Sequence, residues 1–211
     1  MDRVAAAFGY PFRRGSAGAW LVGVLLLVLF PLGVVPLLGY SVAVVRASTA
    51  DPAAGPPGWR PLTRLLREGL LLALVLAVLS APFGVLAWAL VAPVGAVIGG
   101  LLPDSFLRAS IPEVVALALA ALPWGILLLV LMPPATARFA ASGRALDLVD
   151  IVASLRLLHL RFATWNLVVV AIVTAWALGL AGLGLALVGV IPGVFYALLV
   201  SSHATAALAD A

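Results

Sequence analysis

The chain has 211 residues, of which 65% are hydrophobic and 9% are charged, and its formal net charge at pH 7 is +4. A soluble domain has roughly a quarter of its residues charged, so this composition excludes a water-covered globule and indicates that lipid surrounds most of the chain. The absence of cysteine excludes disulfides and thiolate metal sites.

The first long apolar stretch, Ser16–Val45, contains Pro31 and Pro36 near its middle. Because proline ends or kinks a helix, the stretch is either one kinked span or a hairpin of two short spans. Short cytoplasmic loops carry an excess of basic residues, and only the hairpin places the arginines before this stretch on the same side as those after it. We therefore favour the hairpin.

An arginine-bearing segment follows the Pro- and Gly-rich loop 51–58. Within Trp59–Glu68, Arg60, Arg64 and Arg67 have the spacing i, i+4, i+7 and alternate with apolar residues. This pattern predicts an amphipathic helix at the lipid headgroups. Glu68 comes one turn after Arg64, which predicts an ordinary ion pair on one helix face.

Two further apolar stretches, Gly69–Pro103 and Val114–Ala137, are each long enough to cross a bilayer. Gly95 and Gly99 are spaced to allow close contact between helices. Glu113 is expected in the first turn of the third stretch, where a carboxylate favours the helix N-terminus.

The segment Arg144–Phe162 predicts a longer interfacial helix with Asp147, Asp150, Ser154 and Arg161 on one face. Arg144 lies near Asp147, which favours a plain ion pair. Catalysis by the two carboxylates is the alternative.

The last stretch, Phe162–Ala209, is long enough for two spans with a break near Gly189–Gly193. His159 and His203 are interpreted as polar residues at the membrane interface, because a metal site needs three or four suitable ligands.

The sequence contains an apparent internal repeat. Val35–Tyr40 resembles Ile191–Tyr196, and in each segment a proline precedes a tyrosine by four residues. The predicted fold is therefore an all-α membrane protein, a single transmembrane domain over 1–211. It has about six transmembrane helices, or five if the first stretch is one kinked span. They form three hairpin units, roughly 1–50, 59–138 and 144–211, with amphipathic interfacial helices.

Several short motifs resemble those of the DUF4013 family, a prokaryotic family of multi-pass membrane proteins of unknown function. The motif residues are Tyr10-Pro11-Phe12, Trp20, Gly39-Tyr40, Arg46, Pro57, Trp59, Gly69-Leu70, Ala140-Ala141-Ser142-Gly143, Pro192, Tyr196 and His203. Family members usually carry acidic residues in the first loop, where this chain has arginines. The resemblance implies a membrane topology and no particular chemistry.

No motif predicts an enzyme. There is no Gly-x-Ser-x-Gly elbow, a Walker A loop is impossible without lysine, and ionisable residues are almost absent from the spans. We expect a non-enzymatic cell-membrane protein with cytoplasmic termini and no catalytic, cofactor-binding or metal-binding residues. It would organise lipid or a membrane partner. The alternative is a transporter or permease-type subunit for a neutral or lipidic solute, because broken helices often form midplane sites.

Anionic lipid headgroups are the expected partners, with a second copy of the chain or another membrane protein left open, and nucleic acid is not indicated. Arginine suits phosphate because its guanidinium binds bidentately, although a GC-rich genome would also enrich it. The headgroup candidates are Arg13, Arg14, Trp59, Arg60, Arg64, Arg67, Arg138, Arg144, Arg156 and Arg161. The helix-break and packing candidates are Pro31, Pro36, Gly95, Gly99, Gly189, Pro192 and Gly193.

Overall fold

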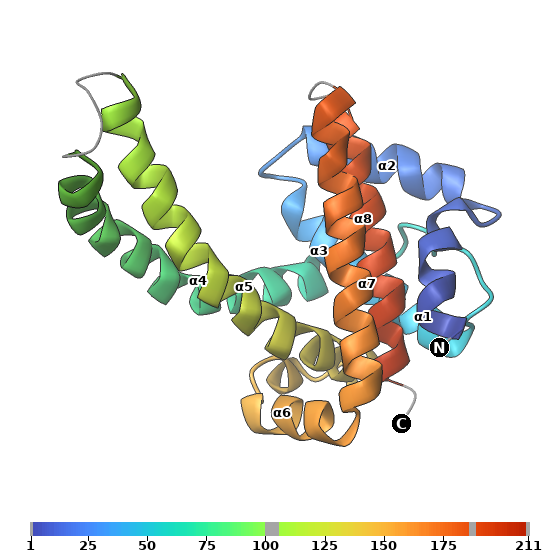
Figure 1. Ribbon diagram of the computed structural model, residues 1–211. Coiled ribbons are helices and arrows are strands. Elements are labelled where there is room, and N and C mark those ends of the chain that lie inside the picture. The colour runs from blue at the N-terminus through green and yellow to red at the C-terminus, as the bar shows by residue number, and fades with distance from the viewer. Residues whose placement is uncertain (1, 100–105, 186–188, 210–211) are drawn as a thin grey trace. The chain divides into compact units, whose positions relative to one another are not determined.

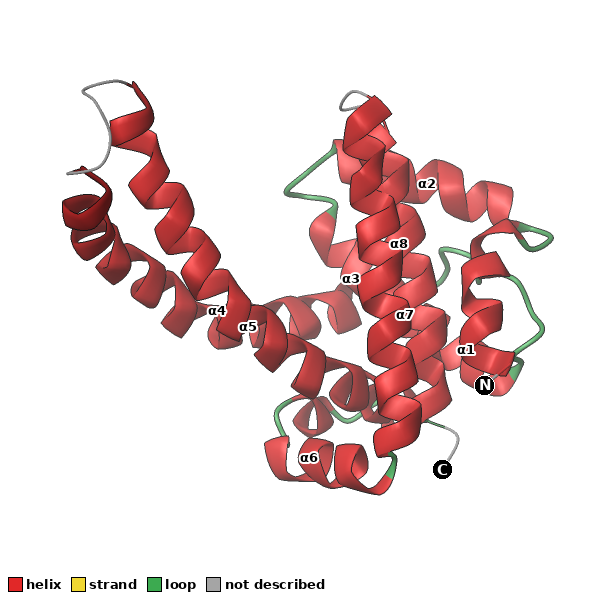
Figure 2. Ribbon diagram, viewed as in Figure 1, coloured by secondary structure: helices red, strands yellow, loops and turns green. Residues whose placement is uncertain are grey.

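A computed structural model describes residues 2–99, 106–185 and 189–209. These residues form helices and connecting turns, and no strand occurs among them (Figure 2). The helices are α1 (Asp2–Ala6), η1 (Ala7–Phe12), α2 (Ser16–Val28), α3 (Val34–Ala50), α4 (Leu62–Gly99), α5 (Phe106–Ser142), η2 (Ala145–Leu148), α6 (Ile151–Leu160), α7 (Phe162–Ala181), η3 (Gly182–Leu185), α8 (Val190–Thr205) and η5 (Ala206–Leu208).

The helices belong to two compact units (Figure 1). The first unit comprises Met1–Ala73 and Val130–Ala211, and the second comprises Leu74–Leu129. Helices α4 and α5 contribute residues to both units. The three hairpin units expected from the sequence remain a prediction.

Four helical segments in the described residues are long and apolar enough to cross a membrane. They are Leu62–Ile98, Ser110–Ser142, Phe162–Gly184 and Val190–Leu208. Large apolar side chains are exposed along them, for example Val78, Trp88 and Leu122 at 72%, 79% and 68%. Lipid, unlike water, accommodates such a surface without cost, so the structure has the form of a helical membrane protein.

The first apolar stretch is interrupted, as its prolines predict. Helix α2 ends at Val28 and α3 begins at Val34. With 13 and 17 residues, both fall short of the roughly 20 residues that usually cross the hydrocarbon core. The total of six spans therefore remains a prediction, whereas a division of the first stretch into two helices is confirmed.

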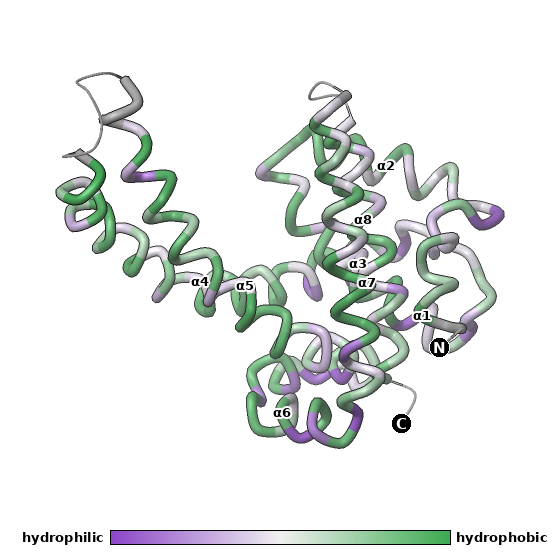
Figure 3. The backbone as a smooth tube through the Cα atoms, viewed as in Figure 1, coloured by the Kyte–Doolittle hydropathy of each residue, from purple (hydrophilic) through white to green (hydrophobic). Residues whose placement is uncertain are grey.

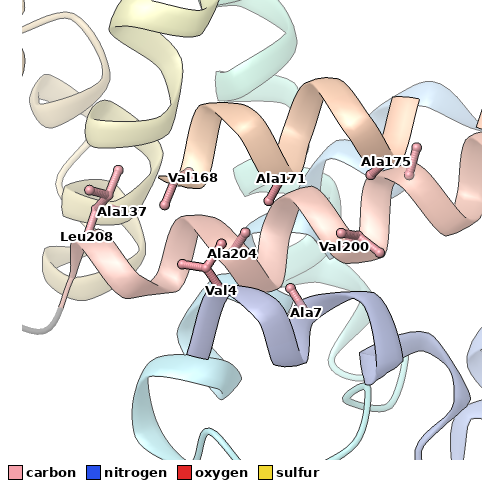
Figure 4. Packing of buried hydrophobic residues seen from close by; sticks show 10 residues of the cluster. Val4, Ala7, Ala137, Val168, Ala171, Ala175, Val200, Ala204 and Leu208 are labelled. Atoms are coloured by element: carbon pink, nitrogen blue, oxygen red, sulfur yellow. The ribbon is translucent and has the colours of Figure 1, made fainter. Parts of the chain in front are cut away.

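Small residues bring α7 and α8 together as an antiparallel pair. Ala171 and Ala175 of α7 pack against Val200 and Ala204 of α8 in one buried cluster (Figure 4). Val4 and Leu208 belong to the same cluster, so the beginning and the end of the described chain lie at one end of this pair.

Glycines let α7 and α8 approach each other still more closely at the end of the pair beside η3. A Cβ atom on Gly193 would lie 2.2 Å from the carbonyl oxygen of Gly179, and one on Gly189 would lie 2.5 Å from that of Gly182. Gly189 and Gly193 therefore allow close approach of the two backbones within a single chain. Gly95 makes a looser contact, since its Cβ would lie 3.7 Å from Pro112, and the packing of Gly99 lies outside the described residues.

The two copies of the apparent repeat form the central helices of the first unit. Pro36 and Pro192 are each the third residue of their helix, α3 and α8, where proline costs little because the first helical N–H groups have no partner in the helix. Tyr40 and Phe195 are both fully buried and their rings lie 6.3 Å apart. The repeated segments therefore pack against each other in the core of the first unit.

Two expected interfacial helices differ from the structure. Residues 62–68 are the first turns of α4 and continue without a break into the apolar part of that helix. The segment Arg144–Phe162 divides into η2 and α6, because Asp150 caps α6 by accepting a hydrogen bond from the N–H of Ala153 at 2.9 Å. Glu113 lies inside α5 rather than in its first turn, since that helix already begins at Phe106.

The second unit contains α4 from Leu74 to its end and α5 from its beginning to Leu129. The indole Nε1 of Trp124 donates a 3.0 Å hydrogen bond to the hydroxyl of Ser80. The residues around this bond are apolar and include Phe83, Leu117 and Ala121. The hydrogen bond satisfies both polar groups within an apolar environment, as intramembrane polar residues usually require.

Candidate functional site

Ion pairs among the described residues of the first unit lie at one end of its helices, which we call the basic end. Here the end of α3, the start of α4 and the end of α5 meet η2 and α6. In the first unit, hydrophilic residues gather around α6 and the adjoining helix ends, while α7 and α8 are hydrophobic over most of their length (Figure 3).

Glu68 is the centre of the basic end. Its Oε1 accepts hydrogen bonds from Arg46 Nη2 and Arg64 Nε, both at 2.8 Å, and its Oε2 accepts one from Arg46 Nη1 at 3.2 Å. The carboxylate side chain is only 9% exposed. A buried charge must be paired to be tolerated, and two guanidinium groups meet this need. The predicted Arg64–Glu68 pair is confirmed, but Arg46 was not expected there.

Arg46 joins three helices. Besides binding Glu68 of α4, its Nε donates a 3.0 Å hydrogen bond to the carbonyl oxygen of Ala140 in α5. Helix α5 ends two residues later at Ser142, and Gly143 follows with φ +71°. The left-handed conformation at Gly143 ends the helix in the usual way and lets the chain turn away beside the arginines.

Two open cavities flank this ion-pair network. One has a volume of about 500 Å³ and is lined by Thr63, Arg64, Arg67, Glu68, Leu71, Phe139, Gly143 and Ala145. The other has a volume of about 440 Å³ and is lined by Arg46, Thr49, Ala50, Arg64, Ala140, Ala141, Ser142 and Gly143. Arg64 and Gly143 belong to both walls, so the cavities adjoin each other.

Arg67 lines the larger cavity without any hydrogen bond or ion pair among the described residues. Arg60, in the same sequence cluster, is also exposed and unpaired within that part of the chain and does not line either cavity. Of the arginines described in this segment, Arg64 is paired with Glu68 and lines both cavities, Arg67 is unpaired and lines the larger cavity, and Arg60 lies outside both.

A second network attaches α6 to α5. Arg138 Nη2 donates to the carbonyl oxygens of Asp147 and Asp150, at 2.6 and 2.9 Å, and to the hydroxyl of Ser154 at 3.0 Å. Its Nη1 lies 3.7 Å from the carboxylate of Asp150. The expected ion pair between Arg144 and Asp147 is therefore not formed. Arg138 pairs with Asp150, and the Ser142 hydroxyl donates a hydrogen bond to the Asp147 carboxylate.

The candidates for chemistry do not converge. Asp147 lies in η2 and Asp150 precedes α6, so they do not share one helix face. Neither aspartate nor His159 is among the residues that line the cavities of the basic end. The pair of carboxylates on one helix face, which suggested catalysis, is therefore not present in the described part of the chain.

His203, interpreted from the sequence as a polar residue at the membrane interface, is fully buried within the protein. Its Nδ1 lies 2.8 Å from the hydroxyl of Ser48 in α3, and its ring stacks on Tyr10 with 4.2 Å between centroids. Burial raises the pKa of the Tyr10 phenol, while the Ser48 hydroxyl and Arg13 act in the opposite direction. These contacts join η1, α3 and α8 in the core.

Arg13 and Trp59, two of the candidates for headgroup contact, also contact other residues of the protein. Arg13 Nη1 donates to the carbonyl oxygens of Pro52 and Ala54 at 2.5 and 2.9 Å, and so holds the loop after α3. Trp59 stacks on Tyr40 with 3.9 Å between ring centroids. A role for these two residues and for Arg14, Arg60, Arg144, Arg156 and Arg161 at lipid headgroups remains a prediction.

Large apolar side chains cover much of η2, α6 and the residues beside them. The exposed residues are Leu146, Val149, Ile151, Val152, Leu155, Leu160 and Phe162. Val152 and Leu160 are the most exposed, at 75% and 73%. Exposed Arg144 precedes them in the sequence, and exposed Arg156 lies among them. We call this set the α6 surface, and α6 itself is too short to cross a membrane.

The helix breaks that suggested a transporter lie at the boundaries of separate helices. The first lies between α2 and α3, and the second, expected at Gly189–Gly193, coincides with the first turn of α8, which begins at Val190. Neither is an unwound segment in the middle of one described helix, which is the arrangement that forms midplane substrate sites. This observation no longer favours a transporter.

The family model described as "Protein of unknown function (DUF4013)" matches residues 22–188. The chain belongs to the DUF4013 family. No curated protein and no solved structure matches it.

The DUF4013 motif residues noted in the sequence contact one another in the first unit. Besides the contacts of Arg46, the Tyr40 hydroxyl donates to the carbonyl oxygen of Pro57 at 2.8 Å. Gly39 and Gly69 allow α3 and α4 to cross closely, since a Cβ on Gly69 would lie 2.7 Å from the backbone nitrogen of Gly39. These residues act as packing and polar contacts between helices, which explains why their spacing in the sequence reveals no catalytic pattern.

Proposed function

We propose that this DUF4013 protein is a non-enzymatic cell-membrane protein that organises anionic lipid around its basic end. The observation that carries the proposal is the α6 surface, where large apolar side chains are exposed on a helix too short to span. An amphipathic helix of this kind lies in the plane of the membrane, with its apolar side chains at the acyl boundary and its arginines among the phosphates.

Electrostatics supports the same placement. Each arginine near an anionic leaflet contributes about 1 kcal/mol of attraction. Basic residues also collect in short cytoplasmic loops. The basic end therefore faces the cytoplasm in our proposal, together with both ends of the described chain, because Val4 and Leu208 pack in one cluster at that end.

The experiment uses the natural lack of cysteine. Single substitutions Val152→Cys on α6 and Ala53→Cys in the exposed loop after α3 would carry the same fluorescent label in the full chain. In vesicles containing phosphatidylglycerol, nitroxide-labelled lipid should quench the label at position 152, and aqueous iodide should quench the one at position 53. Equal iodide quenching at both positions, without quenching from lipid, would reject the placement of α6.

Lipid organisation itself is tested by the composition of the bound lipid. Native mass spectrometry of the full chain from mixed nanodiscs should show phosphatidylglycerol enriched over phosphatidylcholine. The double substitution Arg144→Gln and Arg156→Gln should reduce this enrichment, because it removes positive charge from the α6 surface and leaves the Arg46–Glu68 network intact. Unchanged enrichment in this variant would reject α6 as the lipid-organising element.

A further inference from the structure

The two adjoining cavities of the basic end have an excess of positive charge. Their walls contain the guanidinium groups of Arg46, Arg64 and Arg67 and the single carboxylate of Glu68. Three positive charges and one negative charge leave a net +2. The proposed lipid contact at α6 does not use this charge.

The donor groups in the cavities are held in place before any ligand binds. Arg64 contacts Glu68 through Nε, which fixes the side chain and leaves its two terminal nitrogens without a hydrogen-bond partner among the described residues. Arg67 follows by three residues on α4, so both guanidinium groups lie on neighbouring positions of one helix face. Two like charges at this spacing repel each other, and an anion between them would relieve the repulsion.

The hydroxyl of Thr63 in the wall of the larger cavity adds a further donor. The hydroxyls of Thr49 and Ser142 in the wall of the smaller cavity already donate to the carbonyl oxygen of Val45 and to the carboxylate of Asp147. Planar guanidinium groups match the oxygens of a phosphate in pairs, whereas a carboxylate or chloride ion would leave several of these donors unused. Volumes of about 500 and 440 Å³ leave room for a phosphate and its attached group.

We propose that Arg64 and Arg67, supported by Arg46 and Glu68, form a binding site for a phosphate group, either free or as the headgroup of a phospholipid. The headgroup form of this site rests on the proposed lipid function, whereas binding of free phosphate does not. Glu68, which also lines the larger cavity, acts as the positioning residue because its carboxylate orients the guanidinium groups of Arg46 and Arg64.

The test measures binding of inorganic phosphate to the full chain in an uncharged detergent, with chloride at matched ionic strength as the reference. Arg67→Gln should weaken phosphate binding at least about tenfold, because it removes charge-assisted hydrogen bonds. Arg67 has no protein partner among the described residues, so its replacement should leave the fold intact. Arg67→Lys keeps the charge without the planar pair of donors and should bind at an intermediate level.

Arg60→Gln is the matched control, since it removes the same charge from the same segment outside both cavities. It should change phosphate affinity less than about twofold, as expected for a screened surface charge. Equal losses in Arg60→Gln and Arg67→Gln would show general charge attraction and overturn the site. Absence of phosphate binding to the unaltered chain would overturn it as well.

Nanodiscs of phosphatidylglycerol and phosphatidylcholine distinguish the two sources of phosphate. If Arg67→Gln lowers both phosphate binding and the retention of phosphatidylglycerol, the ligand is a lipid headgroup. If it lowers phosphate binding alone, the site takes a soluble phosphate compound. Neither result depends on where the labels on α6 lie, so this site and the proposed function can fail separately.

Discussion

The guanidinium of Arg46 binds the carboxylate of Glu68 through two nitrogens, at 2.8 and 3.2 Å. This contact joins the last turns of α3 to the first turns of α4. The same guanidinium reaches α5 through Ala140. One side chain therefore holds together the helices that form both cavities of the basic end.

Replacing one partner of this pair should destabilise the protein strongly. Arg46→Gln leaves Glu68 with one partner in a site where its side chain is 9% exposed, and breaking a buried pair costs about 3 kcal/mol or more. Arg64→Gln leaves the two-nitrogen contact in place and should cost under about 1 kcal/mol, because its side chain is 51% exposed. Unfolding of the full chain in mixed micelles, followed by tryptophan fluorescence, measures both changes. Equal effects would contradict the assigned role of Arg46.

The close contact between α7 and α8 should not tolerate a methyl group. In Gly193→Ala the new Cβ would lie 2.2 Å from the carbonyl oxygen of Gly179, and separating the helices should cost about 1–3 kcal/mol. Gly84→Ala is the control, because its new Cβ would have no neighbour within 4 Å and alanine favours a helix by up to about 1 kcal/mol. The same micelle unfolding assay compares them. A neutral Gly193→Ala variant would show that α7 and α8 pack differently.

Stability should fall at high pH through Tyr10. Burial raises the pKa of its phenol in the folded protein, so the neutral form is favoured by folding. The stabilisation is complete below the unfolded pKa of about 10 and is lost as the pH rises through the higher folded value. Tyr10→Phe removes this ionisation while keeping a ring against His203. Between pH 9 and about 11, the unfolding free energy should therefore decline less in Tyr10→Phe than in the unaltered chain.

Cysteine labelling should place the basic end on the cytoplasmic side. Gly184→Cys lies in η3, at the end of the α7–α8 pair opposite to the basic end, and its side-chain position is open. A membrane-impermeant maleimide added to intact cells should label Gly184→Cys and leave Ala53→Cys unlabelled until the membrane is opened. The reverse pattern would invert the proposed orientation.

Much of the fold follows from local pattern. Pro31 and the residues around it divide the first apolar stretch, and the glycines near Gly189 mark the α7–α8 connection, because these residues act on the backbone next to them. The Arg64–Glu68 pair is equally local, since its members are four residues apart. The division of 144–162 was missed because the cap at Asp150 competes with helix continuation, and apolar periodicity alone does not reveal it.

The sequence by itself determined that this chain belongs in lipid, that its helices are long and apolar, and that its arginines gather in a few segments. Composition and short-range spacing carry that information, because solvation and helix formation depend on neighbouring residues. Only the tertiary structure decided that Arg46 meets Glu68, that His203 is buried on Tyr10, and that Arg67 remains unpaired beside a cavity. Those relationships join residues from 22 to about 190 positions apart, and they arise when helices pack, which no local pattern encodes.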